Sequence, residues 1–162
     1  MLYDKERTMK ISPSKVKQCM AHFEEVCRNS DIKRTHQRME IFREVAQTGD
    51  HPDAEKVYQG VRKRMPTVSL DTVYRTLWML KDLGLIRTLG LAREKTRFDA
   101  NLSQHHHFVC QCCGLTQDLY CETYDKLTPP ESVKALGRVE TTHVEVRGVC
   151  RACTRKLESP EL

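Results

Sequence analysis

The sequence contains no long apolar run, since it has no stretch of about 18 consecutive apolar residues of the kind that spans a membrane. Its first residues, MLYDKERTMK, hold no apolar core ahead of a cleavage site, so we expect no secretory signal. A glycine-rich phosphate loop is also missing, which removes one common sequence signal of an enzyme's substrate pocket. We therefore expect a cytoplasmic protein that does not associate with membranes.

Cysteine, in contrast, is abundant, with eight among 162 residues. In a reducing cytoplasm, cysteines favour metal ligation or redox chemistry over structural disulfides. Apolar residues make up 39% and charged residues 30%, which is the composition of a folded chain and excludes disorder. The length suits one compact domain or two small ones.

Positive charge is concentrated in the first part of the chain. Residues 1–100 carry 20 lysines and arginines against 14 acidic residues, whereas residues 101–162 carry 7 against 8. A basic half is typical of a protein that binds a polyanion, most simply nucleic acid. A solvated basic surface would explain the same charge equally well.

Four helices are predicted before residue 84, because apolar residues recur there at spacings of three and four. Ser12, Asp53 and Ser69 are expected to cap the first, third and fourth helices, and Gly49 and Gly84 to end the second and fourth. The residues expected to face the core are Val16, Met20, Phe23, Cys27, Met39, Phe42, Val45, Val57, Val61, Met65, Val73, Leu77 and Leu80.

A basic segment follows, with short β-type stretches on either side of Gly90, and it predicts a hairpin over residues 85–99. Helices followed by such a hairpin are typical of a winged helix-turn-helix domain, whose fourth helix here would enter the major groove of DNA. Thr72, Tyr74 and Arg75 lie on the early turns of that helix, where their side chains suit bases or phosphates. A plain helical bundle would show the same periodicity.

Two C-x2-C pairs, separated by 36 residues, predict a closed tetrahedral thiolate site that favours zinc: Cys110 with Cys113, and Cys150 with Cys153. Cys112 lies between the two cysteines of the first pair, and the sequence alone would allow it to replace one of them as a ligand. The two-residue spacing and Gly114, which frees the backbone for a turn, favour the outer two cysteines. Cys112 and Cys121 are then spare thiols. Since the pairs lie far apart in the chain, we expect the metal to be structural.

Three consecutive histidines precede the first cysteine pair. In an extended segment side chains alternate, so we expect His105 and His107 to share one face and His106 to point to the other. Together with a carboxylate, such a pair forms a nitrogen–oxygen site that suits ferrous iron or manganese better than a thiolate set does. The nearby candidates are Asp99, Asp118 and, before the third helix, His51. An exposed loop histidine and a polar strand end remain simpler interpretations.

From residue 15 to residue 155 the chain resembles the ferric uptake regulator family of metal-dependent bacterial repressors. The matching blocks are RTHQR (34–38), HPDAEKVY (51–58), VSLDTVYRTLWMLKDLGLI (68–86), RFD (97–99), HHHFVCQCCG (105–114) and RGVCRAC (147–153). The resemblance implies an α/β (α+β) fold class, with an N-terminal winged helix-turn-helix domain and a small C-terminal α/β dimerisation domain. We place these domains at residues 1–98 and 106–162, joined by a hinge at 99–105.

The resemblance also implies what the protein binds. A homodimer would bind a double-stranded DNA operator through Tyr74 and Arg75, with Lys15 and Arg34 nearby, and we expect it not to be an enzyme. Structural zinc would be held by the four paired cysteines. A regulatory iron or manganese site at the junction of the two domains would take its ligands from His51, Asp99, His105, His107 and Asp118.

Aspartate at positions 99 and 118 resembles the peroxide-responsive branch of the family, because many iron-sensing members carry glutamate at both. In that branch ferrous iron reacts with hydrogen peroxide, a ligating histidine is oxidised, and the protein releases its operator. By position the oxidised residues would be His51 and His105. An iron-uptake or zinc-uptake regulator of the same family, a metal-dependent enzyme and a thiol switch at Cys112 or Cys121 are the alternatives.

The sequence departs from the family at one position. Many members have a histidine of a further metal site eight residues before the third zinc cysteine, where this chain has Thr142. His143 lies one residue later, and in a strand a shift of one residue reverses the face. We therefore do not expect that further site.

Overall fold

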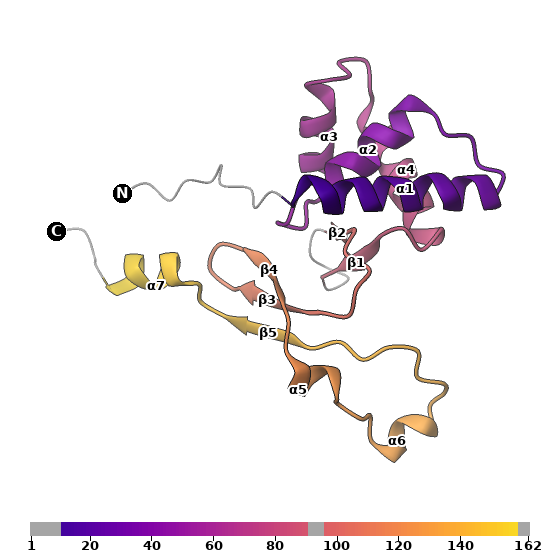
Figure 1. Cartoon of the computed structure of the whole chain (residues 1–162). Coiled ribbons are helices and arrows are strands. Elements are labelled where there is room, and N and C mark those ends of the chain that lie inside the picture. The colour runs from indigo at the N-terminus through magenta and orange to yellow at the C-terminus, as the bar shows by residue number, and fades with distance from the viewer. Residues whose placement is uncertain (1–10, 91–95, 159–162) are drawn as a thin grey trace. The chain divides into compact units, whose positions relative to one another are not determined.

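The chain folds into two compact units in the computed structural model, which describes residues 11–90 and 96–158 (Figure 1). The N-terminal unit comprises Lys5–Leu102, and the C-terminal unit includes Ser103–Leu162. Across the described residues, the helices are too short or too polar for any of them to span a bilayer. The hinge that we placed at residues 99–105 stays a prediction, because a single structure does not report bending of the chain.

The N-terminal unit is built from four helices, of which the first, third and fourth have the caps that the sequence predicts: α1 (Pro13–Asn29), α2 (His36–Ala46), α3 (Ala54–Arg62) and α4 (Leu70–Asp82). The side-chain oxygens of Ser12, Asp53 and Ser69 each accept a hydrogen bond from a backbone N–H three residues later, which satisfies one of the free donors of the first turn. Gly84 follows α4 with a φ of 70°, a conformation that costs glycine little.

The prediction for the end of the second helix was wrong by three residues. The helix α2 ends at Ala46 and not at Gly49. The hydroxyl of Thr48 donates to the carbonyl of Glu44 at 3.0 Å, and its backbone N–H donates to Val45. These contacts close the last turn early, because a threonine side chain competes with the backbone for helical hydrogen bonds.

The core of the N-terminal unit lies between these helices. Phe23 of α1 and Phe42 of α2 stack with ring centroids 5.2 Å apart, and Leu77 and Leu80 of α4 are fully buried. Of the predicted core residues, Val16, Met20, Met39 and Met65 are only partly buried, and the other nine are buried. The apolar periodicity therefore identified the packed faces of all four helices.

Two short antiparallel strands, β1 (Arg87–Leu89) and β2 (Arg97–Asp99), follow the helices and confirm the predicted strand pairing. Residues 91–95, on which the predicted turn falls, lie outside the described residues. The ring of Phe98 meets that of Trp78 of α4 edge-on, with ring centroids 6.1 Å apart. The two strands, which form the wing of the winged helix, therefore pack beside α4. Phe98 N–H also donates to the carbonyl of Pro52, which ties β2 to the loop before α3.

The cap of α4 has a measurable consequence for stability. Ser69→Ala removes the acceptor that lies 3.1 Å from the backbone N–H of Thr72, and we expect the free energy of unfolding of the N-terminal unit to fall by about 1 kcal/mol. Urea unfolding followed by circular dichroism measures this loss. Thr67→Ala, at an exposed position two residues earlier, is the control and should change stability much less. Equal losses in the two variants would show that the cap contributes nothing specific.

The C-terminal unit is a three-stranded sheet with short helices. Its strands are β3 (His106–Cys110), β4 (Thr116–Leu119) and β5 (Glu145–Gly148). The central strand β3 pairs antiparallel with β4 and parallel with β5. The chain between β4 and β5 carries α5 (Glu122–Asp125) and α6 (Glu131–Lys134), and α7 (Arg151–Glu158) follows β5 (Figure 1).

Candidate metal centres and nucleic-acid interface

The four paired cysteines meet at one end of the sheet of the C-terminal unit. Cys110 ends β3, Cys113 lies in the turn that follows, and Cys150 and Cys153 flank the start of α7. All four Sγ atoms lie within 4.8 Å of one another, and those of Cys113 and Cys150 are 3.8 Å apart. Cys112 is exposed and is not part of this group. The structure therefore assembles the set of thiols that the spacing selected.

Backbone hydrogen bonds hold this arrangement in place. Gly114 has a φ of 72°, and its N–H donates to the carbonyl of Cys110, which folds the first pair into a tight turn. The N–H of Gln111 donates to the carbonyl of Gly148 at 2.8 Å, so the turn is fixed to the end of β5. The N–H of Cys150 donates to the sulfur of Cys110 at 3.3 Å. The two pairs are thus positioned by the sheet itself.

The electrostatics of the thiols fit a cation. Burial opposes ionisation of Cys110, but backbone N–H groups of Cys150, Cys113 and Cys112 donate to its sulfur and lower its pKa to about 6. Burial raises the pKa of Cys113, and hydrogen bonding to Cys150 raises that of Cys153. One sulfur is thus stabilised as a thiolate, and a cation would ionise the rest. Four converging sulfurs fit tetrahedral zinc and leave no open position for a reacting ligand.

A second group of ligand atoms lies at the start of β3 and on β4 of the same unit. The Nε2 atoms of His105 and His107 are 3.0 Å apart, and Oδ1 of Asp118 lies 3.6 Å and 3.8 Å from them. The register explains the approach, because His107 is directly opposite Asp118 in the antiparallel pair. Asp118 Oδ2 accepts a hydrogen bond from the hydroxyl of Tyr120, and the other carboxylate oxygen faces the imidazoles.

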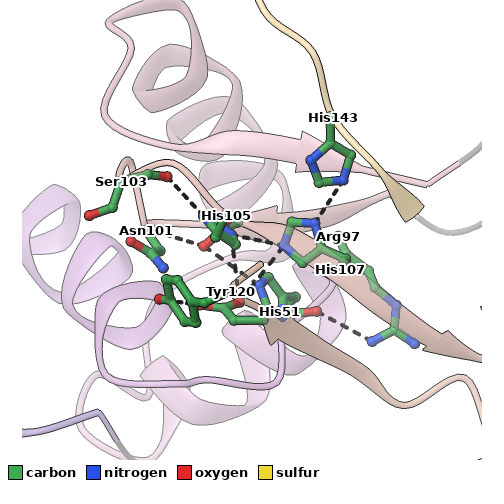
Figure 2. A network of polar contacts seen from close by, with 10 residues as sticks. His51, Arg97, Asn101, Ser103, His105, His107, Tyr120 and His143 are labelled. Carbon is green, nitrogen blue, oxygen red and sulfur yellow. Dashed lines mark hydrogen bonds and ion pairs between the residues drawn. The ribbon is translucent and has the colours of Figure 1, made fainter. Parts of the chain in front are cut away.

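The second ring nitrogens show how these imidazoles are oriented (Figure 2). Nδ1 of His105 lies 2.9 Å from the carbonyl of Ser103, which can only accept, so Nδ1 carries the proton and Nε2 keeps its lone pair. Nδ1 of His107 lies 3.0 Å from Nε2 of His143. Burial lowers the pKa of His143, and His107 lowers it further, which favours a neutral ring. Imidazole nitrogens beside a carboxylate fit ferrous iron or manganese by their chemistry.

The middle histidine points the other way, as predicted from strand alternation. The Nδ1 atom of His106 accepts a hydrogen bond from Val144 N–H, so its Nε2 carries the proton and donates to Asp125 at 3.1 Å. This side chain is fully buried, and its ring meets that of Tyr124 edge-on. His106 therefore packs the sheet against α5 on the face opposite His105 and His107.

In the N-terminal unit, the side chains of His51 and Asp99 form a buried pair. Nε2 of His51 lies 3.7 Å from Oδ1 of Asp99, and both side chains are buried. His51 has a φ of 48°, a left-handed conformation that is uncommon outside glycine and costs of order 1 kcal/mol or more. Arg97 donates to the carbonyl of His51 at 3.3 Å (Figure 2). The backbone N–H of Asn101 donates to Asp99 at 2.7 Å. Strand β2 thus holds both candidate ligands.

The helix α4 presents the side chains expected to meet DNA. Tyr74 is 43% exposed and Arg75 is exposed, with its guanidinium 3.4 Å from Asp71 one turn earlier. Thr72 is half-buried, and its hydroxyl lies 2.9 Å from that of Ser69 in the cap. Tyr74 and Arg75 are therefore accessible to a partner, whereas Thr72 belongs mainly to the cap.

Two further candidate DNA contacts lie outside α4. Lys15 is exposed on the first turn of α1. Arg34 is exposed before α2 and forms an ion pair with Glu24 at 3.2 Å. Exposed ion pairs are worth at most about 1 kcal/mol, so Arg34 can exchange Glu24 for a phosphate at little cost.

Sequence reasoning missed three residues that support the candidate ligands: Ser103, Arg97 and His143. The Ser103 contact is made by a backbone carbonyl and leaves no signal in the sequence. Arg97 lies two residues before the candidate ligand Asp99 in the RFD block, and this position was the only sign of its role in the sequence. His143 was set aside because of its offset by one residue, but it lies ahead of β5, where strand alternation does not apply.

A winged-helix unit followed by a unit that gathers metal-binding side chains is the architecture of a metal-responsive transcriptional regulator. Residues 29–152 match the model of the Ferric uptake regulator family, and the chain belongs to this family. Two curated relatives are peroxide-responsive repressors named PerR. That of Staphylococcus epidermidis is 30% identical over 78% of this chain and 84% of its own length, and that of Staphylococcus aureus strain Mu50 is 32% identical over 80% and 87%.

Solved structures confirm the fold class. The Helicobacter pylori ferric uptake regulator Fur superposes with a TM-score of 0.68 at 19% identity, covering 90% of this chain and 96% of that one. The Campylobacter jejuni peroxide stress regulator gives 0.59 at 24% identity, covering 85% and 98%. The chain therefore has an α+β fold, with an N-terminal winged helix-turn-helix domain and a small C-terminal α/β domain.

Proposed function

We propose that this protein is a homodimeric, metal-dependent repressor that senses hydrogen peroxide through oxidation of a histidine. The observation that carries the proposal is the approach of two imidazole nitrogens, from His105 just before β3 and His107 on β3, to an aspartate oxygen on β4. This donor set is suited to ferrous iron. Aspartate at positions 99 and 118, and the peroxide-responsive function of the two curated relatives, support the peroxide branch.

The two kinds of ligand set have different roles in this proposal. The four cysteines hold structural zinc, which fixes the end of the sheet to α7. The other set holds regulatory iron or manganese through His51 and Asp99 of the N-terminal unit and His105, His107 and Asp118 of the C-terminal unit. Because these ligands come from both units, occupancy sets the spacing of the two winged helices in the dimer. That spacing must match the half-sites of a palindromic operator.

Ferrous iron held by this set would supply the redox chemistry by which hydrogen peroxide oxidises a neighbouring imidazole, with a net transfer of two electrons from the ring to the peroxide. One ring C–H bond of His51 or His105 gains an oxygen atom to become C–OH, and the other peroxide oxygen leaves as water. The oxidised ring no longer offers the same nitrogen donor, so the two units lose their common anchor. The population then shifts toward the form that does not fit the operator.

The DNA-binding half of the proposal assigns Arg75 and Tyr74 to the major groove, with Thr72 at the start of the helix. Arg75 can reach a guanine edge or a phosphate after leaving Asp71. Lys15 and Arg34 add phosphate contacts, which fix the register without reading sequence. By linkage, operator DNA must tighten metal binding by the same factor as metal tightens DNA binding.

The test is mass spectrometry of the iron-loaded protein after peroxide. Anaerobic protein with ferrous iron is expected to gain 16 Da, one oxygen atom, on a peptide that contains His51 or His105, and to release a palindromic operator in parallel. Manganese-loaded protein is the matched control and should stay bound and unmodified, because manganese(II) reduces peroxide poorly.

Other results would point to other functions. Iron-loaded protein that keeps its operator in peroxide, without the mass change, would be an iron-uptake regulator. Selective occupancy of the second site by zinc would indicate a zinc-uptake regulator. A peroxide response abolished by serine at both Cys112 and Cys121 would indicate a thiol switch, and turnover of a small substrate would indicate an enzyme.

A further inference from the structure

The imidazole of His143 contacts the candidate metal ligand His107 at Nδ1, the ring nitrogen that does not face the other candidate ligands. Its Nε2 lies 3.0 Å from Nδ1 of His107 (Figure 2). The other ring nitrogen of His107, Nε2, faces His105 and Asp118. The two histidines are 36 residues apart in the chain, so the contact is created by the fold. The corresponding nitrogen of His105 faces the carbonyl of Ser103. Each imidazole of the pair therefore has a partner for its second nitrogen.

The partner of Nδ1 decides whether His107 can bind a metal through Nε2. A neutral imidazole carries one proton, so a lone pair on Nε2 requires the proton on Nδ1. If His143 accepts through Nε2, His107 holds its proton on Nδ1 and presents a lone pair beside Asp118. If His143 donated instead, Nε2 of His107 would carry the proton and could not act as a ligand. Ligand tautomers are commonly fixed in this way by an outer partner.

The backbone places His143 for this contact. The neighbouring residue Val144 accepts a hydrogen bond from His107 N–H at 3.1 Å and donates its own N–H to Nδ1 of His106 at 3.2 Å. Two hydrogen bonds thus fix Val144 to the histidine segment. The side chain of the preceding residue, His143, then reaches Nδ1 of His107. His143 itself is exposed at the surface, so a substitution there opens no core cavity.

We propose that His143 is a positioning residue of the regulatory metal site, which accepts a hydrogen bond from Nδ1 of His107 and so holds Nε2 ready to bind the metal. The inference rests on the proposed function, because it takes His107 as a ligand. It assigns His143 no bond to the metal. The same contact orients the ring plane of His107 toward His105 and Asp118, as the carbonyl of Ser103 orients that of His105.

The test measures manganese affinity and stoichiometry in the full-length, zinc-loaded protein. His143→Leu removes the acceptor, and we expect it to weaken manganese binding about tenfold with the number of bound ions unchanged. His143→Gln restores an acceptor oxygen near the place of Nε2 and should bind manganese nearly as the wild type does. His22→Leu, an exposed histidine of α1, is the matched control and should change nothing. Competition with a fluorescent chelator gives the affinity, and the visible spectrum of the cobalt-substituted protein reports ligand geometry.

The outcomes separate the possible roles. Loss of a whole equivalent of metal in His143→Leu would make His143 a ligand and overturn the proposal. Affinity unchanged in His143→Leu, or equally weak in His143→Gln, would also overturn it. A wild-type protein that binds no metal beyond zinc would overturn both this inference and the proposed function. If the wild-type protein binds the second metal but no histidine is oxidised by peroxide, only the peroxide-sensing proposal is overturned. The ratio of manganese affinities between the wild type and the His143 variants would still measure the positioning role.

Discussion

A Cys113→Ser protein is expected to lose its tightly bound zinc and, with it, the folded structure of the C-terminal unit. Among the described residues, the buried apolar side chains of this unit are Cys110 and Cys150, and the rest of the core belongs to the N-terminal unit. A small unit without its own core depends on a metal or a partner for stability. Structural zinc contributes about 10–16 kcal/mol of apparent binding free energy at neutral pH, most of which appears as folding free energy.

The effect is measured as zinc content and as structure. Metal analysis of the purified variant should show about one zinc fewer per chain, and circular dichroism should show loss of sheet signal with the helices of the N-terminal unit retained. Size-exclusion chromatography should show loss of the proposed dimer. Cys112→Ser is the matched control, because this exposed thiol is the neighbour of Cys113 and lies outside the group of four. A zinc-free Cys112→Ser beside a zinc-loaded Cys113→Ser would mean that the ligand set is wrong.

A His51→Asn protein is expected to keep zinc and its fold but to lose most of the metal-dependent gain in operator affinity. His51 is the imidazole that the N-terminal unit offers to the proposed regulatory set, so removing it separates metal binding from the winged helix. Coupling between sites is typically 1–3 kcal/mol, hence the operator affinity with manganese should fall about 5–150-fold, to the level without metal. Asparagine is the suitable replacement, because it tolerates the left-handed backbone of His51 at a φ of 48°.

Fluorescence anisotropy with a labelled palindromic operator, at one fixed salt concentration, measures this effect with manganese and with a chelator. His22→Asn, at an exposed position of α1, is the control and should keep the full metal response. If His51→Asn still responds to manganese like the wild type, then His51 is not a regulatory ligand. If it fails to bind DNA even weakly, the substitution has damaged the winged helix.

Some features of the site could be predicted because they depend on a few neighbouring residues. Capping by Ser12, Asp53 and Ser69 involves atoms three residues apart, and the alternation of the three histidines follows from extended backbone. The error at the end of α2 has the same origin. A local hydroxyl, that of Thr48, ended the helix before the glycine that the sequence suggested.

Other features could not be predicted because they join distant segments. Arg97 reaches the carbonyl of His51 across 46 residues, and His143 reaches His107 across 36. No periodicity encodes such pairs, and the alternation rule that excluded His143 applies only inside a strand. In particular, the sequence did not predict the hydrogen-bond partner of the second ring nitrogen of His105 or His107. That partner depends on which loop packs against the ring.

The α+β class was implied by the resemblance to the family. The sequence by itself determined the four helices of the N-terminal unit, the four paired cysteines and the two faces of the histidine segment, because these follow from periodicity and spacing along the chain. Only the tertiary structure decided that Cys112 stands apart from the thiol group, that Asp118 faces His105 and His107, and that His143 contacts His107. The physical reason is that a ligand set depends on distances of 3–4 Å between side chains, and sheet register and backbone hydrogen bonds fix those distances.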